Sequence, residues 1–109
     1  MIIYEVNLTI NPEVEAEFRS WLTDHIKQML KLPGFIAAQI FTRKADEEDR
    51  ALPKKALLTV HYTVKSRKEL EEYFEKYAVK MRADGLQKFP EAFTVHRRIL
   101  YPTLDNNPF

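Results

Sequence analysis

Hydrophobic periodicity alternates along this chain between the pattern of strands and the pattern of helices. Four segments alternate apolar and polar residues or run continuously in apolar ones, as strands do: 2–10, 35–42, 56–64 and 93–101. Two segments between them repeat apolar residues every three or four positions, which predicts helices over 12–31 and 66–84. The predicted order is therefore strand, helix, strand, strand, helix, strand.

This βαββαβ order is typical of the ferredoxin-like α+β fold. Right-handed crossovers would place both helices on one face of a four-stranded antiparallel sheet, with the first and third strands in its centre. The chain is long enough for one domain, which we place at residues 1–102, followed by a C-terminal tail at 103–109. Helices then cover only one face of the sheet within a single chain.

Several local signals refine these elements. Asn11 precedes a proline and is the expected N-cap of the first helix. Ser66 and Glu69 have the spacing of a capping box for the second helix, which we expect to end at a C-cap on Gly85. The segment 35–42 is apolar at nearly every position, so this strand is expected to be covered on both faces.

Composition excludes several classes of protein. The 109 residues include 17 Lys and Arg against 16 Asp and Glu, and a net charge of +1 does not suit a non-specific nucleic-acid binder. The chain has no Cys, which removes disulfides, thiolate catalysis and cysteine-ligated zinc or iron–sulfur clusters. Its 3 His lack the spacing of a metal site, and we expect no metal and no cofactor. Neither a membrane span nor a signal peptide is evident, so a cytoplasmic protein is expected.

The two faces of the predicted sheet differ in character. The set that contains Tyr4 and Tyr62 is the more apolar one and should face the helices. The opposite face mixes polar residues with isolated apolar ones and carries no Phe, Tyr or Trp on its central strands, which disfavours the RNA-recognition mode. Packing against an identical copy is the expected use of this face. The predicted homodimer interface contains Glu5, Asn7, His61, His96 and Arg98, with Glu5 opposite His61 and Asn7 close to Arg98.

Short motifs add a resemblance to a known family. The start Met1-Ile2-Ile3-Tyr4-Glu5-Val6-Asn7, Trp21 with His25-Ile26 in the first helix, Leu86-Gln87-Lys88-Phe89 and Arg97-Arg98 resemble the small bacterial domain-of-unknown-function family 4286. This resemblance implies membership of the dimeric α/β-barrel group, in which two ferredoxin-like protomers pair sheet to sheet. The group includes antibiotic-biosynthesis-type monooxygenases, haem-degrading oxygenases and members with no assigned activity. The family brings no catalytic residues that transfer to this chain.

Strand directions predict a cluster of aromatic and titratable side chains at one edge of the sheet, on the helix side. Such a cluster, mostly apolar with few polar groups, would suit a small-molecule cleft, although aromatic stripes at helical spacing are also ordinary core. His25 is the candidate base, and the alternative is a core histidine with satisfied ring nitrogens. The predicted pocket contains Tyr4, Trp21, His25, Tyr62, Tyr73 and Tyr101.

Two functions remain open at this point. The first is a ligand-binding or regulatory module that works as a homodimer and takes a small aromatic ligand. The second is a cofactor-independent oxygenase or isomerase acting on a small aromatic compound, with His25 as base and Trp21, Tyr4 and Tyr62 lining the cleft. Because Arg97 and Arg98 are adjacent in a strand, one of them must face the helices. It would meet an anionic ligand or, as we expect, a glutamate such as Glu71 or Glu75.

Overall fold

The computed structural model of the chain describes residues 1–45 and 54–103, so most of the predicted C-terminal tail lies outside the described residues. The elements follow the predicted order, with the second helix in two pieces: β1 (Ile2–Ile10), a 3-10 turn (Pro12–Val14), α1 (Glu15–Met29), β2 (Phe35–Thr42), β3 (Ala56–Val64), α3 (Arg67–Lys76), α4 (Ala78–Lys88) and β4 (Phe93–Leu100). The strands form one antiparallel sheet in the order β2-β3-β1-β4. The predicted ferredoxin-like α+β fold is confirmed.

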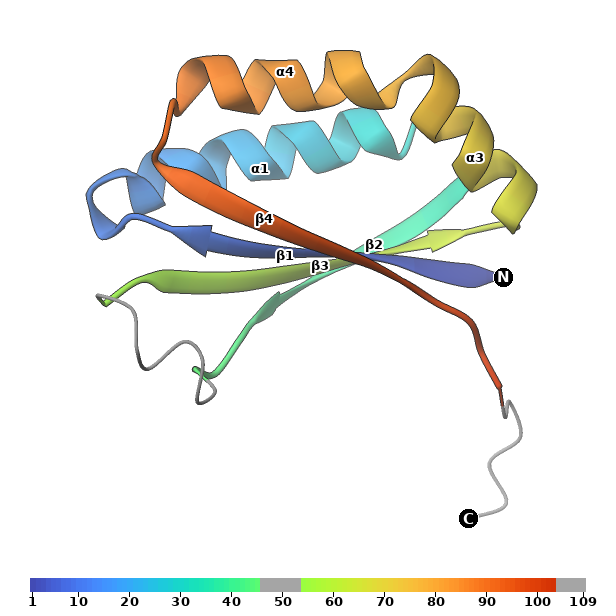
Figure 1. Ribbon diagram of the computed structural model, residues 1–109, viewed down its shortest axis with the longest axis horizontal. Coiled ribbons are helices and arrows are strands. Elements are labelled where there is room, and N and C mark those ends of the chain that lie inside the picture. Colours follow the sequence, from blue (N-terminus) through green and yellow to red (C-terminus); the bar gives the residue numbers. More distant parts are fainter. Residues whose placement is uncertain (46–53, 104–109) are drawn as a thin grey trace.

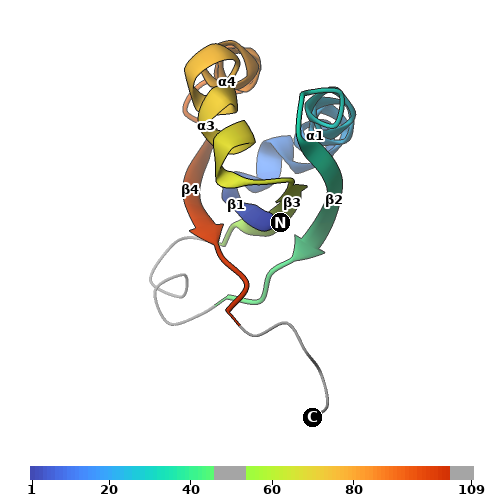
Figure 2. The same cartoon turned by 90° about the vertical axis from the view of Figure 1, so that its right-hand side faces the viewer.

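The helices form a single layer on one face of the sheet (Figure 1). Figure 2 shows α1 above the half that contains β2, and α3 and α4 above the half that contains β4. No described helix covers the opposite face, which we call the open face. The helices therefore cover one face of the sheet and leave the open face without a helix layer in the single chain.

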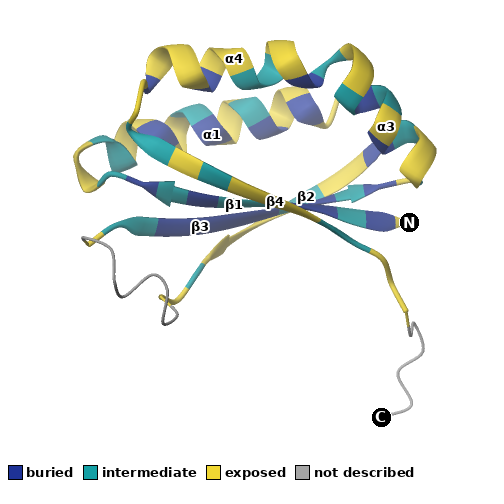
Figure 3. Cartoon of the chain, in the orientation of Figure 1, coloured by how far each residue is buried: buried dark blue, intermediate teal, exposed yellow. Residues whose placement is uncertain are grey.

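The core lies between the helices and the two central strands. Tyr4 pairs with Tyr62 and Leu8 with Leu58 across β1 and β3, and all four side chains are buried. Figure 3 shows the buried positions of α1 on its side toward the sheet. Each large apolar side chain buried in this way contributes roughly 1.5–3 kcal/mol, because its surface is removed from water. The predicted inward-facing set on β1 and β3 is thus confirmed.

The second predicted helix differs from the structure at its centre and its end. The chain bends at Tyr77, which has φ −125° and ψ −28°, so two helices replace one. The Tyr77 N–H still donates to the Tyr73 carbonyl at 2.9 Å, so the bend occurs without loss of this hydrogen bond. The prediction of a C-cap at Gly85 is wrong, since α4 continues to Lys88. Glycine is present there because the Trp21 ring of α1 packs directly against it.

The structure also corrects the expectations for β2 and for two caps. As an edge strand paired only with β3, β2 exposes 54% of Ile36 and 44% of Ile40, so it is not covered on both faces in the single chain. Asn11 has the extended backbone of an N-cap, but its side chain accepts a hydrogen bond from Lys55 instead of from the helix. Ser66 and Glu69 do meet, through a side-chain hydrogen bond and not through the expected bond to a backbone amide.

Candidate functional site

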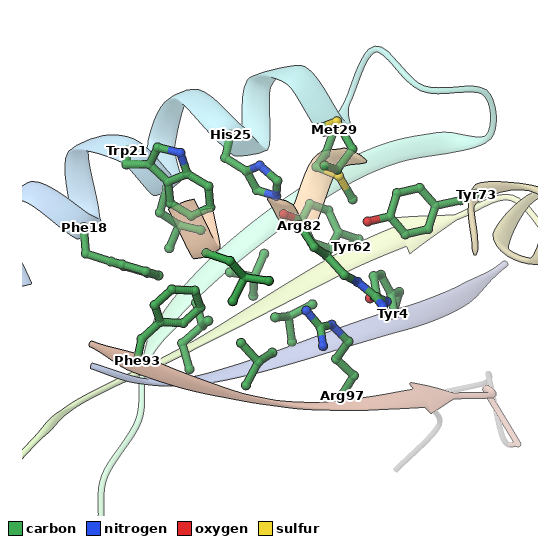
Figure 4. A pocket seen from close by; sticks show the side chains of 17 residues that line it. Tyr4, Phe18, Trp21, His25, Met29, Tyr62, Tyr73, Arg82, Phe93 and Arg97 are labelled. Carbon is green, nitrogen blue, oxygen red and sulfur yellow. The ribbon is translucent and has the colours of Figure 1, made fainter. Parts of the chain in front are cut away.

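A cavity of about 300 Å³ lies between the helix layer and the sheet, and we call it the helix–sheet cavity (Figure 4). Its walls are mostly apolar and come from both central strands, from β4 and from α1, α3 and α4. A well-packed core leaves few voids larger than a water molecule, so this volume is not ordinary packing. Seven of the lining residues have polar side-chain groups: Tyr4, Trp21, His25, Tyr62, Tyr73, Arg82 and Arg97.

Three tyrosines stand together at one end of the helix–sheet cavity. The Tyr4 ring centroid lies 6.0 Å from that of Tyr62 and 5.9 Å from that of Tyr73. Burial raises the pKa of Tyr62 well above its usual range, and it raises the pKa of Tyr73 to about 12. The phenols of Tyr62 and Tyr73 are therefore neutral near pH 7 and can donate hydrogen bonds into the cavity.

Trp21 and His25 line the cavity from α1. Their rings stack with centroids 4.7 Å apart and planes 20° apart, and Trp21 Nε1 donates to Asp84 on α4 at 2.6 Å. Burial lowers the pKa of His25, an effect that the negative charge of Asp84 partly opposes. Among the described residues His25 forms no hydrogen bond, so its neutral imidazole is free to accept a proton.

Two arginines complete the polar lining, and the sequence pointed to only one of them. Arg82 Nη2 donates to the Tyr4 hydroxyl at 3.1 Å, while its buried Nε has no acceptor. Arg97 reaches the cavity from β4. Arg82 is not among the predicted pocket residues because only the apolar members of the stripe were followed. In the single helix that the sequence predicts, Phe74, Ala78 and Arg82 stand four residues apart on one face, which is the signal for Arg82.

The expected ion pair between Arg97 and a helix glutamate is wrong. Glu71 pairs with Arg67 at 3.0 Å, one turn away on its own helix. Within residues 1–45 and 54–103, Arg97 has no carboxylate in ion-pair range. Neither Glu71 nor Glu75 therefore forms an ion pair with Arg97.

Five of the six predicted pocket residues line the cavity: Tyr4, Trp21, His25, Tyr62 and Tyr73. The sixth, Tyr101, is 53% exposed and accepts a hydrogen bond from Arg67 Nη1 at 2.5 Å. It lies outside the cavity because β4 ends at Leu100, so the sheet no longer directs the next side chain. That the cavity holds a ligand stays a prediction.

On the open face, a buried carboxylate organises the central strands. Glu5 is 5% exposed, and it accepts hydrogen bonds from Arg98 Nε at 2.5 Å and Asn7 Nδ2 at 2.9 Å. His61 Nε2 lies 2.8 Å from its other oxygen, so the predicted pairing of Glu5 with His61 is found. The hydrogen bond from Arg98 above all lowers the pKa of Glu5 to about 2, against the effect of burial. This carboxylate is ionised at any pH near neutral.

The predicted approach of Asn7 to Arg98 is found, although the two are not direct cross-strand partners. Arg98 stands opposite Glu5, and the partner of Asn7 on β4 is His96. Arg98 and Asn7 come together because both donate to the same oxygen of Glu5. Thr59 extends the network, since its hydroxyl donates to Asn7 Oδ1 at 2.7 Å. That these residues form a dimer interface stays a prediction.

Two kinds of feature are absent from the described part of the chain. Residues 1–45 and 54–103 contain no cluster of three or more His, Cys, Asp or Glu side chains able to hold a metal ion. The same residues include no helix long and apolar enough to cross a membrane.

Solved structures show the same fold at low sequence identity. An antibiotic-biosynthesis-monooxygenase-type protein from Deinococcus radiodurans superposes with a TM-score of 0.70 at 13% identity, over 100% of this chain and 99% of that one. SnoaB, a cofactor-independent oxygenase from Streptomyces nogalater, gives 0.67 at 15% identity over 99% and 98% of the two chains. The haem degrader MhuD from Mycobacterium tuberculosis, solved with two haems in its active site, gives 0.64 at 15% identity over 96% and 99%.

Comparison with curated proteins gave no match. At identities this low, the structural likenesses establish the fold and carry no residue roles across. The sequence profile described as domain of unknown function DUF4286 matches residues 1–103, which is nearly the whole chain. The chain belongs to the DUF4286 family.

Proposed function

We propose that the protein binds a small molecule with one or two aromatic rings in the helix–sheet cavity. The observation that supports this function is the cavity itself, about 300 Å³ of space with apolar walls and a cluster of hydroxyls at one end. Sites for small molecules have this make-up, because apolar walls supply affinity and a few polar groups fix orientation. Rings such as Phe18, Trp21 and Phe93 offer flat surfaces for an aromatic ligand.

The ligand-binding proposal is tested by thermal shift with phenols, quinols, aromatic acids and haem. A ligand that binds only the folded protein at a hundred times its Kd adds about 2.7 kcal/mol to stability, which raises the Tm by several degrees. Val6→Phe, which fills the cavity, should abolish the shift. Val79→Phe adds the same ring at an exposed site on α4 and should retain it. Equal shifts in both variants would place the ligand elsewhere.

A second candidate function is a cofactor-independent oxygenase or isomerase, and the state of His25 favours it. Its lowered pKa leaves a neutral imidazole on the wall of the cavity, where Trp21, Tyr4 and Tyr62 would hold an aromatic substrate. A base of this kind can take the proton of a phenolic hydroxyl. Oxygen uptake followed in the same titrations tests the oxygenase, which requires uptake that His25→Gln removes while the thermal shift remains; for an isomerase, His25→Gln should abolish the conversion of the bound compound followed by its absorbance.

We also propose that the open face pairs with the open face of a second copy. It carries the half-buried apolar side chains of Ile3 and Leu100 among polar ones, and Phe41 at its edge is 38% exposed. Isolated from a partner, such a mixed surface leaves apolar area in water. A two-fold dimer would cover it symmetrically, and the network around Glu5 would lie within the contact.

The dimer predicts a specific response to added charge. His96→Glu places a carboxylate on the exposed part of the open face, and facing copies would bring two such charges together. We expect sedimentation velocity to show a dimer for the wild type and a monomer for this variant. Gln87→Glu makes the same charge change on the exposed side of α4 and should remain dimeric. A wild type that sediments as a monomer at all concentrations would contradict the proposal.

A further inference from the structure

We propose that the ligand of the helix–sheet cavity is an anion, namely an aromatic carboxylate whose charged group lies between Arg82 and Arg97. This inference rests on the proposed function and adds the chemical class of the ligand. Figure 4 shows the two arginines extending into the cavity, Arg82 from α4 and Arg97 from β4. Arg82 is held by the Tyr4 hydroxyl and by the Phe74 ring, and neither arginine has a carboxylate partner among the described residues.

The charge balance of the cavity is the first argument. Its lining includes two guanidinium groups and no Asp or Glu, and burial keeps His25 largely uncharged. Both arginines also act on one group, since the positive charges of Arg82 and Arg97 each oppose the rise in the pKa of Tyr73. A small, mostly apolar space with two positive charges and no negative one favours an anion.

Other arginines in the described part of the chain have carboxylate partners. Arg19 and Arg67 each pair with a glutamate at 3.0 Å, and Arg98 pairs with Glu5 at 2.5 Å. Among the described residues, Arg82 and Arg97 have no such partner. The contrast is sharpest on β4, where adjacent arginines face opposite sides of the sheet and only the one on the open face finds a carboxylate.

An unsatisfied donor is the third argument. Arg82 Nε is buried with no acceptor among the described residues, although buried N–H groups nearly always have one. The same guanidinium donates from Nη2 to the Tyr4 hydroxyl, which fixes its orientation at the tyrosine end of the cavity. A carboxylate there could accept from Arg82 and from Arg97, and the neutral phenol of Tyr73 could donate to it. The ring of the ligand would then occupy the apolar part of the cavity.

The experiment compares each carboxylate with its own neutral amide. Benzoate is paired with benzamide and 2-naphthoate with 2-naphthamide, and binding is measured by isothermal titration calorimetry at pH 7.5. We expect the carboxylate of the fitting pair to bind at least about tenfold more tightly, because a hydrogen bond to a charged partner is worth that factor or more. Arg97→Gln should weaken the carboxylate by about tenfold and leave the amide unchanged.

Controls separate this effect from changes in folding or in overall charge. Arg97 is exposed and has no ion-pair partner among the described residues, so its replacement should leave the Tm unchanged. Arg19→Gln removes the same charge from the exposed side of α1 and should keep wild-type affinity. Arg82→Lys retains the charge but not the fork of donors, and it should weaken the carboxylate selectively.

The outcomes distinguish the two proposals. If carboxylate and amide bind equally, and Arg97→Gln affects both or neither, the anion assignment is wrong while the ligand-binding function stands. If no member of either pair binds and Val6→Phe changes nothing in the thermal-shift screen, the proposed function fails and the anion assignment with it. Selective loss of the carboxylate in both arginine variants supports the assignment.

Discussion

Replacing Glu5 with glutamine should lower the free energy of unfolding by about 2–3 kcal/mol at pH 7. The carboxylate is 5% exposed and holds Arg98, Asn7 and His61 together, so a neutral amide leaves these donors without an adequate acceptor. The value lies below the full cost of breaking a buried ion pair because the Arg98 side chain is 57% exposed and recovers water. Urea unfolding at one fixed protein concentration measures the difference.

The effect of this substitution should depend on pH in a defined direction. The folded pKa of Glu5 is about 2, below the ordinary value of 4.5, so folding favours the ionised form. That contribution is fully present above about pH 4.5 and is lost as the pH falls toward 2. The stability difference between wild type and Glu5→Gln should therefore shrink between these values.

A matched exposed glutamate provides the control for this prediction. Glu71 pairs with Arg67 at 3.0 Å, but its side chain is 62% exposed. Glu71→Gln should cost no more than about 0.5 kcal/mol at pH 7, as is usual for surface pairs within a helix. Equal losses for Glu71→Gln and Glu5→Gln, or a loss that does not change down to pH 2.5, would contradict the role assigned to the buried carboxylate.

Gly85→Ala should destabilise the protein by about 2 kcal/mol, although alanine is the better helix former. A Cβ atom at this position would lie 2.7 Å from Cη2 and 2.9 Å from Cζ2 of Trp21. The indole cannot move aside cheaply, because Phe18 and His25 pack against it at 5.3 Å and 4.7 Å between ring centroids and Asp84 binds its Nε1. The variant must therefore separate α1 from α4 or displace the ring into the cavity.

A double-mutant cycle tests the cause of this loss. Trp21→Phe removes the part of the ring that the new methyl group would meet, so Gly85→Ala should cost little or even stabilise in that background. The chain has 1 Trp, so its fluorescence reports directly on the position in the single Gly85→Ala variant. Additive effects in the cycle, with unchanged Trp21 emission, would show that the two residues do not compete for space.

Periodicity was sufficient to predict the fold, and it failed where packing overrides local signals. Alternation assigned the faces of the strands, and with Tyr4 taken to lie opposite Tyr62, antiparallel counting placed Glu5 opposite His61, as found. The sequence predicts a helix end at Gly85 because glycine is common at helix C-termini. Glycine is needed at this position because the Trp21 indole, 64 positions earlier in the chain, packs against it. No local sequence pattern indicates this contact. The apolar run at 35–42 likewise indicates burial without saying whether this chain or another supplies the cover.

The cavity was only partly predictable for a similar reason. Strand direction and helical spacing brought five of the six predicted residues to its walls. Spacing could not indicate that the side chains leave about 300 Å³ unfilled, because cavity volume depends on how rings from several elements interlock. Arg82 was missed since a charged residue on an apolar stripe is usually read as the edge of that stripe, where its long side chain extends to water.

The two adjacent arginines of β4 belong to different surfaces of the protein. Arg97 faces the helix–sheet cavity and Arg98 faces Glu5, and only the parity of their positions assigns these roles. Point substitutions can therefore alter either surface independently. A one-residue insertion or deletion inside Phe93–Leu100 would instead exchange every side chain beyond it between the two surfaces. Length variation among relatives should thus be confined to the loops that flank this strand.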